Sequence, residues 1–253
     1  MRAAVRAAAR VLGAAILLAA GPALAARPFD STDASVPAPG EFELELGPVG
    51  LLHEGSKGAE QRFIVAPKVV LNLGVIPSWE VVLEGRQLIR TGDTQGEARY
   101  QLVDTGAFIK GVLRAGVLQD LSGPSVGVEM GALLPTVNGE DGLGAAAIVV
   151  LSHRIAGLTG HLNGVAVYSR SHIGGLAGGL ILEGPQAWAV RPVGEMVVEK
   201  ERGSAVLASV LGGAIWRVND SLMLDLAGRA GRGGGAEIWE IRAGLTWSTR
   251  LWR

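Results

Sequence analysis

Residues 221–230 read Ser-Leu-Met-Leu-Asp-Leu-Ala-Gly-Arg-Ala, and they carry the clearest structural signal in the chain. The even-numbered positions are all apolar or glycine, whereas the odd-numbered positions include Ser221, Asp225 and Arg229. Because side chains of a β-strand alternate between the two faces of a sheet, a repeat of two predicts a strand with one apolar face. We therefore expect Leu224 to face lipid and its neighbour Met223 to face the opposite side.

The same alternation recurs along most of residues 41–252. At 61–76 it predicts an outward Phe63 and Val65 and an inward Arg62. Runs of this kind are long, whereas strands of soluble proteins centre on roughly 5–6 residues and membrane strands need about 9–11. Long alternating strands favour a transmembrane barrel over a soluble sandwich.

Composition and charge narrow the class of protein. The chain has 253 residues, 38 of them glycine, with 48% hydrophobic and 19% charged residues. A formal net charge of -1 lacks the basic excess that steers proteins to nucleic acid, so we expect no nucleic-acid partner. The absence of cysteine excludes disulfides, thiolate metal sites and a lipoprotein anchor.

The N-terminus predicts export. Arg2, Arg6 and Arg10 precede an apolar run at 11–20, and Ala25 ends a small-residue cleavage pattern, so residues 1–25 are expected to be a cleaved signal peptide. No later charge-free run is long enough to span a membrane as a helix. Because only helices and closed barrels satisfy their backbones in lipid, we expect a barrel in the bacterial outer membrane, with lipid and the barrel-assembly machinery as its partners.

Breaks in the alternation divide the barrel region, residues 41–253, into twelve strands. The fold class is therefore predicted to be all-β: a 12-stranded antiparallel, up-and-down transmembrane β-barrel. Mostly tight connections alternate with generally more polar ones, which is typical of periplasmic turns and outer loops. The predicted strands are 41–54, 61–76, 79–90, 101–116, 124–136, 143–155, 159–170, 172–183, 187–200, 204–218, 222–231 and 237–252.

Residues 26–40 precede the first strand. Pro28, Pro37 and Pro39 exclude a regular strand or helix there. This segment is expected either to hang in the periplasm or to fold into the barrel as a partial plug, with Asp33 against an inward-facing arginine.

Charged residues on the predicted inner faces mix both signs. They allow two interpretations, a polar pore lining or a ladder of paired charges that fills the barrel. Asp104 and Glu129 are expected to face each other on adjacent strands, and the mixture predicts weak ion selectivity. The predicted lumen-lining residues are Arg62, Lys68, Glu80, Glu84, Asp104, Lys110, Arg114, Glu129, Arg191, Glu195, Asp225, Arg229, Glu240 and Arg242.

Tryptophans at strand ends predict an interface girdle. Trp79, Trp188, Trp216 and Trp239 fall on apolar faces near the ends of their strands, where rings meet lipid headgroups.

Catalytic signals are weak. The pairs Ser152-His153 and Ser171-His172 are adjacent in sequence, which puts their side chains on opposite faces of a strand and argues against a dyad within either pair. The four histidines show no metal-site spacing, and no helix pattern follows the glycine-rich stretch 231–236, which is expected to be a loop. We expect no enzyme activity, metal or cofactor.

Several motifs resemble a known family. Residues 27–34 (Arg-Pro-Phe-Asp-Ser-Thr-Asp-Ala) and 39–47 (Pro-Gly-Glu-Phe-Glu-Leu-Glu-Leu-Gly) are similar to the mature N-terminus of outer-membrane barrels of the meta-pathway phenol-degradation family. Residues 104–106 (Asp-Thr-Gly) and 134–136 (Leu-Pro-Thr) resemble its internal motifs, whereas Thr32 stands where the family pattern has an acidic residue.

Members of this family are described as outer-membrane transporters. The resemblance therefore implies a channel or carrier for passive passage of small molecules, including aromatic or hydrophobic ones. Two alternatives remain: a non-conducting structural or adhesive barrel, and a membrane-embedded hydrolase, which the missing dyad disfavours.

Overall fold

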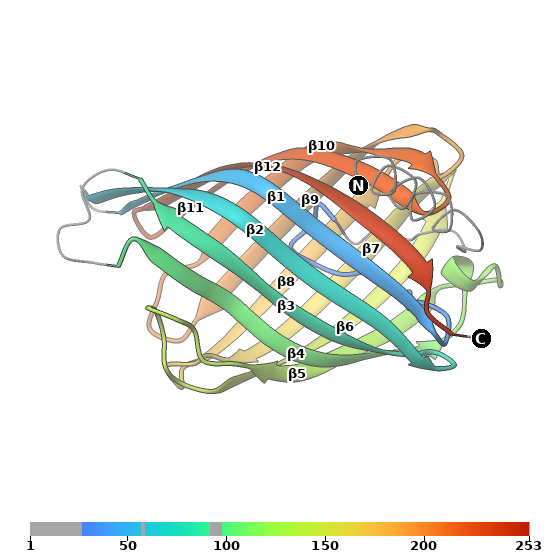
Figure 1. Cartoon of the computed structure of the whole chain (residues 1–253), viewed down its shortest axis with the longest axis horizontal. Coiled ribbons are helices and arrows are strands. Elements are labelled where there is room, and N and C mark those ends of the chain that lie inside the picture. The colour runs from blue at the N-terminus through green and yellow to red at the C-terminus, as the bar shows by residue number, and fades with distance from the viewer. Residues whose placement is uncertain (1–26, 57–58, 92–97, 253) are drawn as a thin grey trace, which may run out of the picture.

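The computed structural model describes residues 27–56, 59–91 and 98–252. Twelve strands form a closed antiparallel barrel in which each strand pairs with its neighbours in sequence and β1 pairs with β12 (Figure 1). This arrangement confirms the predicted fold class. The predicted signal peptide, 1–25, lies outside the described residues, and within those residues no helix is long and apolar enough to cross a membrane.

Every strand begins and ends within three residues of its predicted bounds. A short 3-10 helix, η1 (Val117–Gln119), interrupts the connection between β4 and β5 and was not expected. The strands are β1 (Glu41–Ser56), β2 (Ala59–Ile76), β3 (Trp79–Arg90), β4 (Tyr100–Arg114), β5 (Ser125–Leu133), β6 (Gly144–Ile155), β7 (Leu158–Tyr168), β8 (Gly174–Glu183), β9 (Val190–Glu201), β10 (Leu207–Asn219), β11 (Leu222–Gly233) and β12 (Ala236–Arg250).

The two ends of the barrel differ less than expected. We name the end with the β2–β3, β6–β7 and β10–β11 turns the turn end, and the opposite end the loop end. The loop end carries the connection at 134–143 but also a tight β11–β12 hairpin at 234–235. The turn end carries the long β4–β5 connection with η1, so connection length alone does not distinguish the ends.

Outward side chains are mostly apolar, and inward ones are largely polar. Leu162, Leu226 and Ile241 are more than half exposed in the isolated chain, as lipid-facing residues of a barrel should be. Thr246 and Ser248, on the other face of β12, are buried inside the barrel. Met223 lies inward and Leu224 outward, as expected.

β-Bulges at two prolines exchange the faces of β1 and β2. The pairing register shifts between Leu46 and Val49, around Pro48, and between Val65 and Lys68, around Pro67. Proline cannot donate to the ladder and is therefore favoured at such irregularities. Consequently Glu41, Glu43 and Glu45 point inward near the turn end, whereas Leu52 points inward nearer the loop end.

The same change of face corrects one prediction. Phe63 and Val65, expected to face lipid, lie inside the barrel, buried in a cluster with Leu52 and Leu88. Arg62, expected in the lumen, points the other way and is exposed beside Glu60, with 3.4 Å between Nη2 and Oε2. A continuous period of two through Pro67 was the wrong assumption.

Candidate functional site

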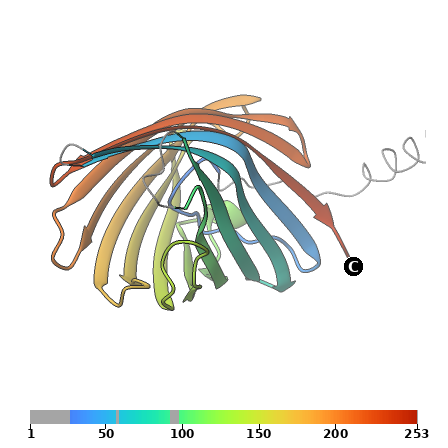
Figure 2. The same ribbon diagram turned by 60° about the vertical axis from the view of Figure 1, so that its left-hand side comes forward.

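The segment before β1 lies within the barrel (Figure 2). Phe29 is 6% exposed and packs against inward residues of β8–β11, including Ile181, Leu211 and Met223. At its end the segment joins the barrel wall, where the backbone amide of Gly40 donates to the carbonyl of Gly74 over 2.8 Å. We call residues 27–38 the lumen segment.

Ion pairs connect the lumen segment to β11 and β12. Asp30 accepts two hydrogen bonds from the guanidinium of Arg242, at 2.8 and 3.2 Å, and lies 3.2 Å from Nη1 of Arg229. Arg27 Nε donates to Asp225 over 3.2 Å, with both side chains buried. Paired, hydrogen-bonded charges of this kind are the arrangement in which burial of an ion is tolerated.

Inward polar side chains also satisfy the backbone of the lumen segment. The Glu195 carboxylate accepts the amides of Asp30 and Ser31 at 2.9 and 2.7 Å. Asn163 bonds both the amide and the carbonyl of Thr32, at 3.2 and 2.9 Å. An irregular segment has no ladder partners, so these side chains supply the hydrogen bonds that its buried backbone requires.

Asp33 anchors the segment on the opposite wall. Its carboxylate lies 3.4 Å from Lys110 Nζ and accepts a 2.7 Å hydrogen bond from the Ser35 hydroxyl. The expected arginine partner is therefore wrong: the partner is a lysine, and the arginines bind Asp30.

The positive charges around Asp30 and Asp33 lower the pKa of both carboxyl groups more than burial raises it. Burial raises the pKa of Asp30, but the Arg242 and Arg229 guanidiniums hold it well below its usual range. Burial likewise raises the pKa of Asp33, and the Lys110 ammonium together with the Ser35 hydrogen bonds lowers it further than burial raises it. Both groups remain ionised in the lumen.

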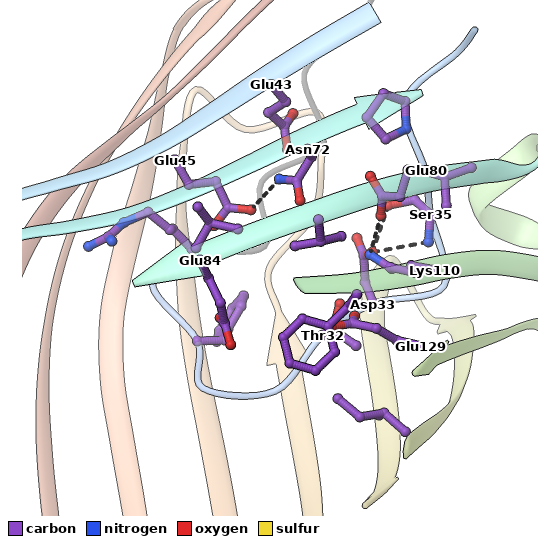
Figure 3. Close-up of a pocket in the computed structure, with 18 of the residues that line it drawn as sticks. Thr32, Asp33, Ser35, Glu43, Glu45, Asn72, Glu80, Glu84, Lys110 and Glu129 are labelled. Carbon is purple, nitrogen blue, oxygen red and sulfur yellow. Dashed lines mark hydrogen bonds and ion pairs between the residues drawn. The ribbon is translucent and has the colours of Figure 1, made fainter. Parts of the chain in front are cut away.

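A cavity of about 440 Å³ lies between the lumen segment and the inner faces of β1–β6 (Figure 3). Its lining includes the carboxylates of Glu43, Glu45 and Glu80 and the apolar side chains of Phe108 and Ile148. Lys110 projects into it between Glu80, at 3.3 Å, and Asp33. We call this cavity the acidic chamber.

The predicted lumen residues divide into three groups. Lys68, Glu80, Glu84, Lys110 and Glu129 line the acidic chamber. The residues of a second group bind the lumen segment directly or pair with charged side chains beside it. This group contains Glu195, Asp225, Arg229 and Arg242, together with Glu240, whose Oε2 lies 3.4 Å from Arg242, and Arg191, which donates to Glu183 over 2.8 Å.

The third group departs from prediction. Arg62 is outside the lumen, and Arg114 lies at the turn-end rim, where it donates to the carbonyl of Pro124 over 2.8 Å. Asp104 does not face Glu129, because it sits at a β4 irregularity with φ of 51° and pairs with Arg86 at 2.5 Å. Glu129 is instead opposite Lys110.

The four predicted girdle tryptophans occupy both ends. Trp79 begins β3, Trp216 precedes the end of β10, and Trp188 belongs to the β8–β9 connection rather than to a strand; all three are near the turn end. Trp239 lies near the loop end, where its ring stacks on His53 with centroids 5.2 Å apart. The girdle itself remains a prediction.

Sequence reasoning missed a hydrogen-bonded chain that crosses three strands. Ser152 Oγ lies 2.8 Å from His161 Nδ1, and His161 Nε2 lies 3.1 Å from Glu183 Oε1. Ser152 and His161 are opposite each other on β6 and β7, a cross-strand relation that adjacent-pair reasoning could not reveal. A serine–histidine pair therefore does occur, but across two strands and not within either of the adjacent pairs considered from the sequence.

The hydrogen bonds between Ser152, His161 and Glu183 help to hold the lumen segment. Ser152 Oγ is fully buried and accepts the amide of Ala34 over 3.1 Å, so the hydroxyl has both a donor and an acceptor partner. A nucleophile needs an approach for its substrate, whereas here the segment covers the oxygen. The sequence signal for these hydrogen bonds was weak: His161 and Glu183 each occupy an inward-facing position of their own strand.

No protein-family model matches the chain, and no curated protein sequence matches it. Solved structures do. The crystal structure of the COG4313 outer membrane channel from Pseudomonas putida F1 aligns with a TM-score of 0.65 at 8% identity, covering 87% of this chain and 100% of that one.

Two further structures are similar. The CymD monoaromatic hydrocarbon channel aligns with a TM-score of 0.51 at 10% identity, over 86% of this chain and 90% of that one. The NanC porin aligns with a TM-score of 0.52 at 7% identity, over 81% and 98%. At these identities the likeness establishes the architecture, and the chain has the fold of outer-membrane channel barrels.

Proposed function

We propose that the chain is a channel of the bacterial outer membrane that lets small molecules pass without catalysis. The observation that carries this proposal is the acidic chamber, a cavity of about 440 Å³ inside a closed barrel. A barrel filled only by paired side chains would leave no such space. Twelve strands also give a bore between that of filled eight-stranded barrels and that of open porins with 16–18 strands.

The assignment to a family and to a class of substrate rests on the lumen segment. Residues 27–34, which resemble the meta-pathway phenol-degradation family, are the residues that bind the inner wall of the barrel. We therefore propose that the chain is a divergent member of that family and conducts small aromatic or hydrophobic molecules. One similar structure is a monoaromatic hydrocarbon channel, which supports this substrate class. We also propose that the barrel-assembly machinery folds the chain into lipid.

Planar-bilayer recording of the purified barrel tests the proposal. We expect discrete current steps of small conductance, because the lumen segment and the Leu52–Phe63–Val65–Leu88 cluster narrow the passage. Heat-dependent migration on SDS gels would show that the recorded protein is folded. A folded barrel without current would overturn the channel and leave the non-conducting structural barrel.

A further inference from the structure

The charges lining the acidic chamber are strongly unbalanced. Eight carboxylate side chains line it against three cationic ones. Of the three cations, Arg27 is paired with Asp225, which is not part of the lining. Among the carboxylates only Asp30 is offset by arginines outside the lining, Arg229 and Arg242. Seven carboxylates therefore share Lys68 and Lys110.

Several of these carboxylates lack partners. Glu43 is 7% exposed, lines the chamber, and forms no hydrogen bond or ion pair with another described residue. Glu84 and Glu129 likewise form none. Glu80 uses one oxygen for Lys110, and its other oxygen, Oε2, is buried with no hydrogen-bond partner among the described residues. Buried carboxylates are costly unless they are paired or protonated, and a cationic ligand in the chamber would supply the missing partner.

The carboxylates that line the chamber are spread out, and this spacing fits an organic cation. Among the described residues, no three His, Asp or Glu side chains are close enough together to hold a metal ion. An ammonium group carries three donors and can bond carboxylates that are more widely spread. Figure 3 shows Glu43 and Glu45, from β1, and Glu80, from β3, around the space.

Apolar side chains are interleaved with the charged ones around the chamber. Val82, Phe108, Leu133 and Ile148 line it opposite the lumen segment, whose Phe29 also contributes. A cavity of about 440 Å³ lies within the roughly 300–1,000 Å³ typical of small-molecule sites. Charged and apolar side chains together match a molecule with one cationic end and one apolar end.

We propose that the acidic chamber binds and passes small organic cations in which a primary ammonium is attached to an apolar or aromatic body. This inference rests on the proposed channel and names its substrate class. The ammonium would lie among Glu43, Glu80 and Glu84, and the apolar body would pack on Phe108 and Ile148. Charged and apolar side chains of the same strands would then contact the two ends of the molecule, since Val82 lies between Glu80 and Glu84 on β3.

Three compounds of matched shape test this assignment by titration calorimetry on the folded barrel in detergent: phenethylammonium, 2-phenylethanol and phenylacetate. We expect phenethylammonium to bind at least tenfold more tightly than either of the others. Glu43→Gln and Glu84→Gln keep the side-chain shape and should each weaken this binding at least fivefold. Glu237→Gln, an exposed position at the start of β12, is the matched control and should change nothing.

Equal affinity for the three compounds, or unchanged affinity in both glutamine variants, would overturn the inference. A second measurement separates it from the channel proposal. Under a gradient of phenethylammonium chloride, the reversal potential of the bilayer current should favour the ammonium ion, and Glu43→Gln should shift it toward chloride. Current without a preference for the ammonium ion would refute the substrate class but not the channel. Binding without current would refute the channel but not the binding site.

Discussion

Asp30 is the residue on which most of the docking of the lumen segment depends. It bonds Arg242 and Arg229 through its side chain and Glu195 through its amide, and these partners lie on three different strands. A single residue thus joins the segment to three of the twelve strands. Removing its charge would leave two guanidiniums facing an apolar and amide surface.

Asp30→Asn is therefore expected to release the lumen segment. Hydrogen bonds to charged groups contribute about 1.5–3 kcal/mol each, so a loss of about 2–3 kcal/mol should raise the population with an undocked segment roughly 30- to 160-fold. The chain has no cysteine, so maleimide labelling of a buried Ala34→Cys reports the opening directly. Asp220→Asn, on the exposed β10–β11 turn, is the control. Equal labelling rates in the two variants would refute this role for Asp30.

Docking should also resist mild acid. The pKa values of Asp30 and Asp33 are depressed in the folded barrel, so their contribution is present above the unfolded value of about 3.9 and is lost as pH falls toward the folded values. Labelling of Ala34→Cys, corrected for the intrinsic thiolate fraction at each pH, should stay constant from pH 7 to pH 5. A rise within this range would show that another group controls the segment.

At the scale of elements, β11 provides a test of depth and face. Leu226 and Leu224 both point outward, but Leu224 is paired with Trp216 and lies nearer the turn end. Arginine on the lipid face costs about 2–4 kcal/mol at the midplane and about 0–1 near the interface. We therefore expect Leu226→Arg to reduce the free energy of unfolding by about 2–4 kcal/mol and Leu224→Arg by less. Urea unfolding from liposomes measures both, and a larger cost at Leu224 would contradict this depth assignment.

The inward neighbour does not behave as the sequence alone suggests. An inward position of a barrel strand ordinarily tolerates arginine better than a lipid-facing one, and Met223 faces inward. It is 2% exposed, packs in the Phe29 cluster, and its sulfur lies 4.0 Å from both Nη atoms of Arg191. A second guanidinium there would lie unpaired beside the first, so the same unfolding assay should show that Met223→Arg is also destabilising, by about 3 kcal/mol or more. A cost below about 1 kcal/mol would show that the lumen relaxes around it.

Strand positions followed from the sequence because period-two alternation is a local property. The faces of β1 and β2 did not, since a bulge at Pro48 or Pro67 moves every later side chain to the other face. The prolines were a visible signal, but their effect depends on the pairing register. Register also explains why Glu129 faces Lys110 and not Asp104.

At the scale of the molecule, carboxylates outnumber cations on one side of the barrel, whereas the arginines of the other side lie among Glu183, Glu195, Asp225 and Glu240. Along each strand the two signs of charge look interleaved, which led to the expectation of weak selectivity. The closed structure places many carboxylates on β1–β5, around the acidic chamber, while Arg191, Arg229 and Arg242 lie on β9, β11 and β12. Spacing along the chain cannot predict which side chains face each other across the lumen, or where an irregular segment docks. Both depend on contacts between residues that are far apart in the sequence.

Whether the lumen segment must move for passage is a property of the whole barrel, and one pair of substitutions addresses it. A Cβ built on Gly127 would lie 3.4 Å from the Cβ of Ala34, close to the roughly 3.5–4.5 Å that a disulfide spans. Ala34→Cys with Gly127→Cys should therefore form a reducible bridge between the segment and β5. With no native cysteine, no competing bridge exists.

The bridged barrel is expected to conduct at least tenfold less than the same protein after reduction, because the bridge fixes the segment across the lumen. Recording one channel before and after adding dithiothreitol makes the protein its own control, and the Ala34→Cys single variant should not respond. Equal currents in both states would mean that molecules pass through the acidic chamber beside a segment that stays docked. In that case the chamber walls, rather than movement of the segment, would set both the rate and the selectivity of passage.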